Sequence, residues 1–143
     1  MSSEHHTPVA HHYGITVADL DRAVAFYRDA LGLTVRERFS VEGEAFADAV
    51  GVDGAAAESV HLDAGSVRLE LVSYAPEGDP RPEAALNQPG ATHVAFTVGD
   101  LDEFVAHLDE RVPRLSEPRT TESGTRICFL RDPEGTLVEV LES

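Results

Sequence analysis

The feature that most constrains the fold of this chain is an internal repeat. The fifteen residues that begin at His12 align with the fifteen that begin at His93, 81 residues later, and eight of the fifteen positions are identical. Each copy continues with apolar residues at the i, i+3, i+4, i+7 and i+11 spacing of a buried helix face. The chain therefore contains two copies of one architecture, and neither copy is long enough to close a site alone. The apolar stripes are Leu20, Ala23, Val24, Tyr27 and Leu31 in the first copy and Leu101, Phe104, Val105, Leu108 and Val112 in the second.

The two copies also end in the same way. A turn at Asp63 leads into an apolar strand that contains Glu70, and a turn at Asp132 leads into an apolar strand that contains Glu139. The first copy is longer than the second between its helix and this turn. We place its extra residues within 41–57, where Ala-rich sequence with several glycines interrupts the strands.

Each copy is predicted to form a strand, a helix and three further strands, which is an α+β fold. The predicted domains are a flexible tail at 1–9, a first module at 10–74, a proline-rich linker or lid at 75–91 and a second module at 92–143. The predicted helices are 20–31 and 101–110, and the predicted strands are 11–17, 34–40, 59–63, 67–74, 92–98, 114–119, 126–131 and 137–142.

The charge of the chain excludes several classes of partner. Asp and Glu number 26 against 11 basic residues, all of them arginine, and the net charge is -15. Such a surface repels nucleic acid and anionic membranes. An acidic, lysine-free surface also suggests a halophilic protein from a high-salt cytoplasm, where ions screen the repulsion. The single Cys128 excludes a disulfide scaffold and fits a reducing cytoplasm, and no apolar run is long enough to span a membrane.

The first strand of each copy has one apolar and one polar face. Side chains alternate along a strand, so Ile15 and Val17 point to the helix side and His12 points to the other side. In the second copy His93 occupies the position of His12. Both histidines are therefore predicted to lie on the face that looks away from the helices.

A repeated glutamate accompanies each histidine. Glu70 and Glu139 lie within apolar strands, where an unpaired carboxylate would cost several kcal/mol. Two histidines and two glutamates related by a pseudo-twofold axis suit a divalent cation with open positions for water or substrate. The sequence therefore predicts a metal centre with the ligands His12, Glu70, His93 and Glu139.

Two segments resemble the vicinal oxygen chelate superfamily. One is the opening His12-Tyr-Gly-Ile-Thr-Val-x-Asp-Leu-Asp, and the other is the closing Phe129-Leu-Arg-Asp-Pro-Glu-Gly-Thr-Leu-Val-Glu139. The resemblance covers residues 10–142. It implies two βαβββ modules that form an incomplete mixed barrel around one divalent metal per site, with Ni, Co or Zn favoured over Mn or Fe. It also implies the same four ligands, a small-molecule substrate and a homodimer.

The four-ligand set is similar to that of glyoxalase I and close to that of the epimerases of the superfamily. The resemblance implies a lyase or isomerase that removes a proton next to a carbonyl and stabilises a metal-bound enediolate. Glu139 would be the base that moves the proton, with Glu70 as its symmetric counterpart. Thr16 stands where glyoxalase I has a basic residue that holds a glutathione carboxylate, so glutathione as the co-substrate is not implied.

Other members of the superfamily provide alternatives. An extradiol dioxygenase would use iron held by His12, His93 and Glu139, but Glu70 would then fill a position that oxygen chemistry needs open. A thiol or epoxide transferase is another possibility within the superfamily. A non-catalytic module that binds a ligand or antibiotic would need no metal ligands, which the retained set of four argues against.

Three further residues are weaker candidates for substrate binding. Arg68 shares a strand face with Glu70 and could hold a carboxylate or phosphate, or pair with a nearby acid. His61 could reach the cavity around the predicted metal centre. Cys128 could line the cavity of the second module, although a buried small apolar side chain is its commoner role.

Overall fold

The structure is a computed structural model that describes residues 7–142. The chain divides into two compact units. Unit 1 extends to Leu20 and resumes over Gly32–Glu77, and unit 2 comprises Asp21–Leu31 and the chain from Gly78 onward. Of the predicted tail at 1–9, residues 1–6 lie outside the described residues, and residues 7–11 precede the first strand as exposed chain. No helix in the described part of the chain is long and apolar enough to cross a membrane.

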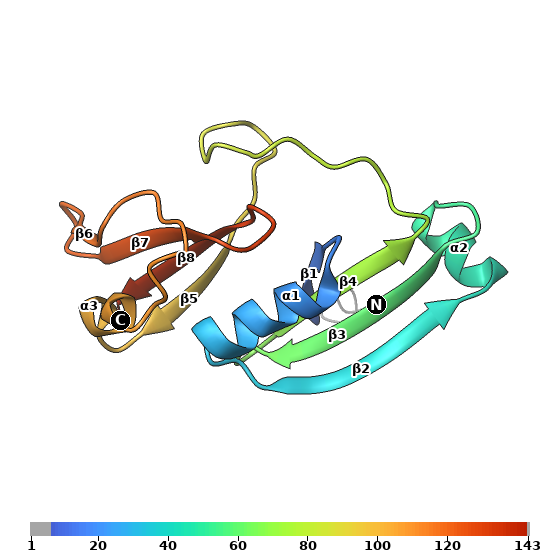
Figure 1. Cartoon of the computed structure of the whole chain (residues 1–143), viewed down its shortest axis with the longest axis horizontal. Helices are drawn as coiled ribbons and strands as arrows, with labels where there is room; N and C mark the ends of the chain where they lie inside the picture. The colour runs from blue at the N-terminus through green and yellow to red at the C-terminus, as the bar shows by residue number, and fades with distance from the viewer. Residues whose placement is uncertain (1–6, 143) are drawn as a thin grey trace. The chain divides into compact units, whose positions relative to one another are not determined.

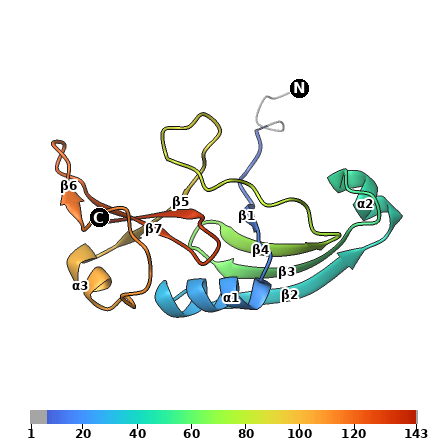
Figure 2. The same cartoon turned by 45° about the horizontal axis from the view of Figure 1, so that its top comes forward.

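Unit 1 contains a four-stranded mixed sheet with the order β1-β4-β3-β2 (Figure 1). The first strand runs parallel to β4, and the other neighbours are antiparallel. A short helix, α2, connects β2 to β3 at one end of this sheet (Figure 2). The elements are β1 (His12–Thr16), β2 (Val35–Glu42), α2 (Glu44–Val50), β3 (Ala56–Asp63) and β4 (Arg68–Ala75).

Unit 2 contains a second sheet with the order β5-β8-β7-β6 and the same topology. Its first strand is again parallel to its last, and the remaining pairs are antiparallel. The repeat in the sequence therefore corresponds to a repeat of sheet topology, which confirms the predicted α+β architecture. The elements are β5 (Val94–Val98), α3 (Leu101–Ala106), β6 (Arg119–Thr120), β7 (Arg126–Arg131) and β8 (Leu137–Glu142).

The helix of the first repeat is continuous but changes its hydrogen-bond pattern. It begins as α1 (Leu20–Ala25), continues as the π-helix η2 (Phe26–Ala30), and ends before Gly32, whose φ of 73° suits glycine. Residues Asp21–Leu31 group with unit 2. Tyr27 is fully buried there, and its hydroxyl donates a hydrogen bond of 2.7 Å to Asp132.

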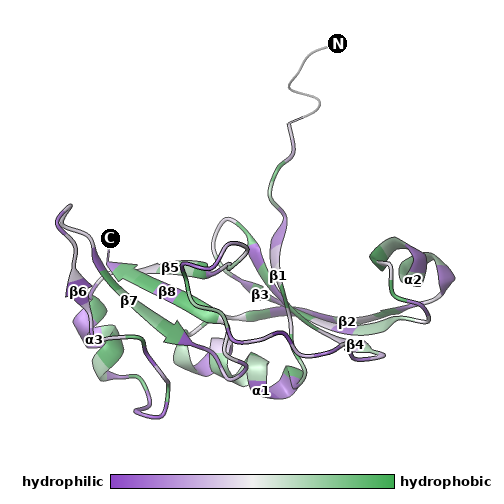
Figure 3. Cartoon of the chain, turned by 90° about the horizontal axis from the view of Figure 1, so that it is seen from above, coloured by the Kyte–Doolittle hydropathy of each residue, from purple (hydrophilic) through white to green (hydrophobic). Residues whose placement is uncertain are grey.

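The core lies on one face of each sheet. The side chains of Ile15 in β1 and of Val17 directly after it are buried, whereas His12 is exposed, as the alternation predicts. In unit 2 the apolar strands β7 and β8 are drawn largely in green in Figure 3, and Leu130, Val138 and Val140 are fully buried. Each sheet therefore leaves its histidine on the polar face.

Three details of the predicted secondary structure are wrong. The helix predicted over 101–110 ends at Ala106. The Asp109 carboxylate accepts a hydrogen bond from the Arg111 backbone N–H, which removes a donor that the helix would need to continue. The strand predicted over 114–119 shrinks to Arg119–Thr120 and one isolated bridge at Arg114, because the prolines beside it cannot donate to a ladder.

The third error is helix α2, which the sequence did not predict. It has only seven residues, and none of them is buried, so the sequence contains no apolar stripe that would predict it. The glycines at its two ends define it instead. Gly51 adopts a left-handed conformation, with φ of 69°, and its N–H bonds to the carbonyls of Ala47 and Asp48. The helix lies within 41–57, where the extra residues of the first copy were placed.

Candidate metal centre

The first predicted ligand pair lies on adjacent parallel strands of unit 1. Glu70 on β4 is in register with Gly14 on β1, and His12 lies two residues before Gly14 on the same face. His12 Nε2 is 3.6 Å from Glu70 Oε1. A Cβ atom at Gly14 would lie 3.7 Å from that same oxygen, which is ordinary van der Waals contact.

The second pair has the same construction in unit 2. Glu139 on β8 is in register with Ala95 on β5, and His93 lies two residues before Ala95. His93 Nε2 is 3.2 Å from Glu139 Oε1. The side chains of His12 and His93 are 38% and 37% exposed, and both glutamates are 18% exposed. The repeat therefore produces two matching pairs of an imidazole nitrogen and a half-buried carboxylate.

This donor set fits a divalent metal ion. Imidazole nitrogen and carboxylate oxygen are ligands that Zn, Ni and Co accept, and a half-buried carboxylate gains from a cationic partner. Within residues 7–142, no three His, Cys, Asp or Glu side chains already form a metal-binding group. Each pair belongs to its own unit, so their union into one four-ligand centre stays a prediction.

The structure places His61 in direct contact with Glu70. Because β3 pairs with β4, His61 stands opposite Glu70, and its Nε2 is 2.8 Å from Glu70 Oε2. The His61 side chain is only 6% exposed. Arg68 donates hydrogen bonds of 3.3 Å to His61 Nδ1 and to Glu37 Oε2. Arg68 thus has an acidic partner and a histidine partner within unit 1, and its role toward a substrate stays a prediction.

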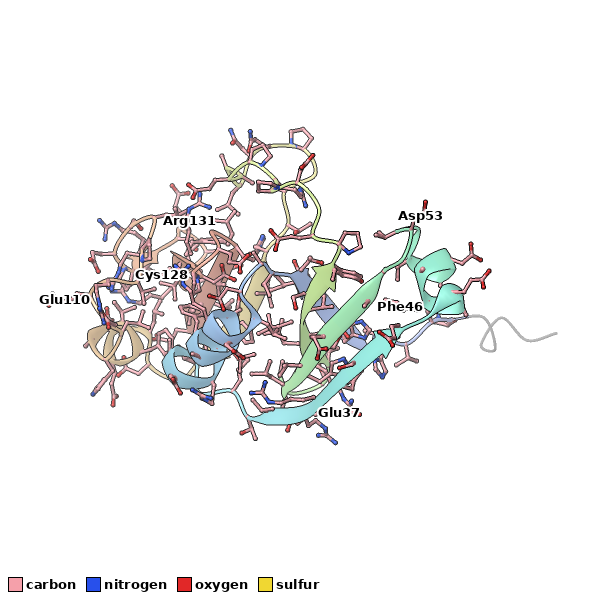
Figure 4. All side chains as sticks on the ribbon, turned by 45° about the vertical axis from the view of Figure 1, so that its right-hand side comes forward. Glu37, Phe46, Asp53, Glu110, Cys128 and Arg131 are labelled. Atoms are coloured by element: carbon pink, nitrogen blue, oxygen red, sulfur yellow. The ribbon has the colours of Figure 1, made fainter. Side chains whose placement is uncertain are left out.

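Cys128 lies at a different kind of position. It is buried on β7, and its thiol donates to the carbonyl of Ser116 (Figure 4 labels the residue). Burial raises the pKa of the Cys128 thiol, with smaller effects from Arg114, which lowers it, and Glu117, which raises it. Cys128 is in register with Val140 and shares a face of the sheet with it. Glu139 is the neighbour of Val140 in β8, so its side chain points to the opposite face from Cys128.

Two neighbours of the predicted ligands were not themselves predicted as site residues. His11 Nδ1 is 2.8 Å from His12 Nδ1, which leaves Nε2 of His12 to face Glu70. The Phe129 ring packs edge-on against His93, with ring centroids 5.2 Å apart. Adjacency in the sequence could have indicated His11. Phe129 required the β7–β8 register, which sets it opposite Glu139.

Two sheets of identical topology, each with a His–Glu pair at its paired parallel strands, define a repeat-built α+β protein with a candidate metal centre. Comparison with known families agrees with this class. The chain belongs to the Glyoxalase/Bleomycin resistance protein/Dioxygenase superfamily, whose family model matches residues 9–140.

Individual relatives cover nearly the whole chain. The uncharacterized protein YwkD of Bacillus subtilis is 36% identical over 138 residues, which is 92% of this chain and 94% of YwkD. A 2-epi-5-epi-valiolone epimerase of an Actinomyces species is 29% identical over 141 residues, or 92% of this chain and 77% of the relative. A glyoxalase family protein from Bacillus cereus has a crystal structure that matches with a TM-score of 0.80 at 31% identity, covering 92% of this chain and 91% of that one.

Proposed function

We propose that this protein is a divalent-metal-dependent lyase or isomerase that moves a proton on a carbon next to a carbonyl group of a small molecule. The observation that carries the proposal is the repeated His–Glu pair, His12 with Glu70 and His93 with Glu139, with matching exposure in both units. Membership of the superfamily and the similarity to an epimerase support the same chemistry. Nickel, cobalt or zinc is the expected metal, and a homodimer in the cytoplasm is the expected form.

The metal would supply a positive charge that stabilises negative charge developing on the substrate oxygen. His12 and His93 would bind it through Nε2, the nitrogen that faces the carboxylate in each pair. Glu139 takes the proton from the substrate carbon and returns it, to the same carbon or to its neighbour. Its side chain is 18% exposed, so the carboxylate is partly open to a substrate.

Proton exchange with heavy water tests this chemistry without knowledge of the natural substrate. The purified protein, loaded with Ni²⁺, Co²⁺ or Zn²⁺, is incubated in heavy water with a panel of 2-hydroxycarbonyl compounds, thiohemiacetals and acyl thioesters. Proton NMR then measures deuterium that enters next to the carbonyl. We expect incorporation that depends on the metal and disappears after chelation. Glu139→Gln is the variant that should lose the exchange, with Glu103→Gln on α3 as a matched surface control.

Two outcomes would contradict the proposal. One is the absence of bound metal by elemental analysis after dialysis against each ion, which favours a ligand-binding module. The other is iron binding with oxygen consumption on catechols and no deuterium incorporation, which favours a dioxygenase. Equal exchange by wild type and Glu139→Gln would remove Glu139 from the proton transfer.

A further inference from the structure

We propose that His61, held by Arg68, is a positioning residue that fixes one carboxylate oxygen of Glu70, so that the two symmetric glutamates divide their roles: Glu70 stays a bound ligand and Glu139 moves. The inference rests on the proposed function, because it concerns the roles of the glutamates in that site.

The hydrogen bonds define the tautomer of His61. Arginine can only donate, so the contact of 3.3 Å between Arg68 and His61 Nδ1 makes Nδ1 an acceptor. The ring proton of neutral His61 is therefore on Nε2, from which it is donated to Glu70 Oε2 over 2.8 Å. A second neutral arrangement would set a guanidinium N–H against a ring N–H. The chain of donors thus runs from Arg68 through His61 to Glu70.

Both ends of this chain are held in place. Arg68 also donates to Glu37 on β2, the edge strand on which Figure 4 labels that residue. The His61 ring lies between neighbours, with the Phe39 ring centroid 5.2 Å away and the His12 ring centroid 5.5 Å away. With 6% of its side chain exposed, His61 has little space in which to rotate. Glu70 Oε2 is therefore tethered, while Oε1 faces His12 and is the oxygen left for a metal.

Unit 2 has apolar residues at the corresponding positions. Phe129 stands opposite Glu139 in the β7–β8 register, as His61 stands opposite Glu70 in the β3–β4 register. The residue two positions before Glu139 is Leu137, whereas Arg68 occupies that place before Glu70. The Glu139 carboxylate hydrogen-bonds to His93, and its cross-strand neighbour offers only an aromatic ring.

The difference assigns a role to each glutamate. A carboxylate with one oxygen hydrogen-bonded to a fixed neighbour keeps its position through a reaction. Even if its other oxygen left the metal, that hydrogen bond would still hold the group in place. An untethered carboxylate can leave the metal and approach the substrate carbon by rotating its own side chain. Proton transfer would accordingly take place from the Glu139 side alone, although the ligand set is symmetric.

The experiment uses the full chain and measures metal binding and tautomer rather than turnover. In the metal-free protein, NMR that correlates ring nitrogens with ring protons reports the His61 tautomer. Titration with Co²⁺, followed by its visible absorption, reports affinity. The variants are His61→Phe, which copies Phe129; His61→Gln, which keeps a donor and an acceptor; Arg68→Leu, which copies Leu137; and Ser59→Ala, a control at a buried polar residue on the same strand and face.

We expect the Nε2–H tautomer in wild type and a mixed or reversed tautomer in Arg68→Leu. His61→Phe should bind Co²⁺ about 10- to 100-fold more weakly, the usual loss when the partner of a metal ligand is removed. His61→Gln should recover most of that loss, and Ser59→Ala should bind as wild type does.

A Nδ1–H tautomer in wild type would overturn the inference, and so would equal Co²⁺ affinity of wild type and His61→Phe. If His61→Phe fails to fold, His61→Gln and Arg68→Leu decide the question by tautomer and affinity. Failure of wild type to bind any metal would contradict the proposed function instead, and the tautomer measurement on the metal-free protein would still test the contact from Arg68 to His61.

Discussion

The two sheets share a strand order and a His–Glu pair, but they differ in what surrounds the pair. In unit 1 the carboxylate of Glu70 contacts His61, which in turn contacts Arg68. In unit 2 the carboxylate of Glu139 stands opposite Phe129. A repeat can therefore keep its predicted metal ligands while it changes their neighbours, and we propose that the neighbours decide which of the two glutamates is free to move.

The polar contacts near the turns before β4 and β8 also differ between the units, but here unit 2 has the more extensive network. Asp132 in unit 2 is 3% exposed and accepts hydrogen bonds from Tyr27 and from the backbone N–H groups of Glu134 and Thr136. Asp63 aligns with Asp132 in the sequence, but it is the last residue of β3, in register with Arg68. Its side chain is 45% exposed and pairs with Arg36 over 2.8 Å. Unit 1 thus has the more elaborate polar network at its predicted ligand Glu70, and unit 2 has it at the turn that contains Asp132.

The largest expected effect compares the two glutamates. Glu139→Gln should lower metal-dependent proton exchange by about 10²- to 10⁴-fold, the range for loss of a general base, with little loss of metal affinity. Glu70→Gln should act mainly on metal affinity, because we propose that this carboxylate is a fixed ligand. Deuterium incorporation and Co²⁺ titration on both variants measure the two effects. Identical profiles for the two variants would contradict a division of roles.

The next effect compares Asp132 with Asp63, which aligns with it in the sequence. Asp132→Ala should destabilise the fold by about 2–3 kcal/mol, because it removes three hydrogen bonds that the buried Asp132 carboxylate accepts, one from the Tyr27 hydroxyl and two from backbone N–H groups. Asp63→Ala should cost about 0–1 kcal/mol, as expected for an exposed ion pair. Urea unfolding followed by circular dichroism measures both. Equal losses would show that the Asp132 network does not stabilise unit 2.

A smaller effect concerns the acidic surface that both units share. We expect the thermal unfolding midpoint to rise by several degrees between low and molar KCl, because ions screen the repulsion among exposed carboxylates. The difference between Asp132→Ala and Asp63→Ala should persist in molar KCl, since the contacts of Asp132 are buried. An unchanged midpoint would contradict the halophilic interpretation of the composition.

The smallest effect is expected at Cys128. In the two registers Cys128 on β7 occupies the place of Val60 on β3, which is 1% exposed. Cys128→Val should therefore change stability by less than about 1.5 kcal/mol and leave proton exchange unaltered. Native Cys128 should also react slowly with a thiol reagent at neutral pH, because burial raises its pKa and limits access. A clear loss of exchange in Cys128→Val would support its predicted role in substrate binding.

Much of the fold could be predicted because the pattern of apolar and polar residues occurs twice in the sequence. The apolar alternation of β1 and β5 and the helix stripe after Leu20 each appear in two copies, so chance matches are easily rejected. Helix α2 was not predicted because none of its residues is fully buried, and the end of α3 was not predicted because a local contact of Asp109 decides it. Both are short features that carry no periodicity.

The sequence alone determined which residues are equivalent: two strands, two histidines and two glutamates in matching order, since side-chain alternation depends only on position along a strand. Only the tertiary structure decided what those residues touch. His61 and Glu70 are nine positions apart in the chain and meet because β3 pairs with β4, and Tyr27 meets Asp132 across more than a hundred residues. Cross-strand register and packing create these contacts, and no repeat in the sequence records them.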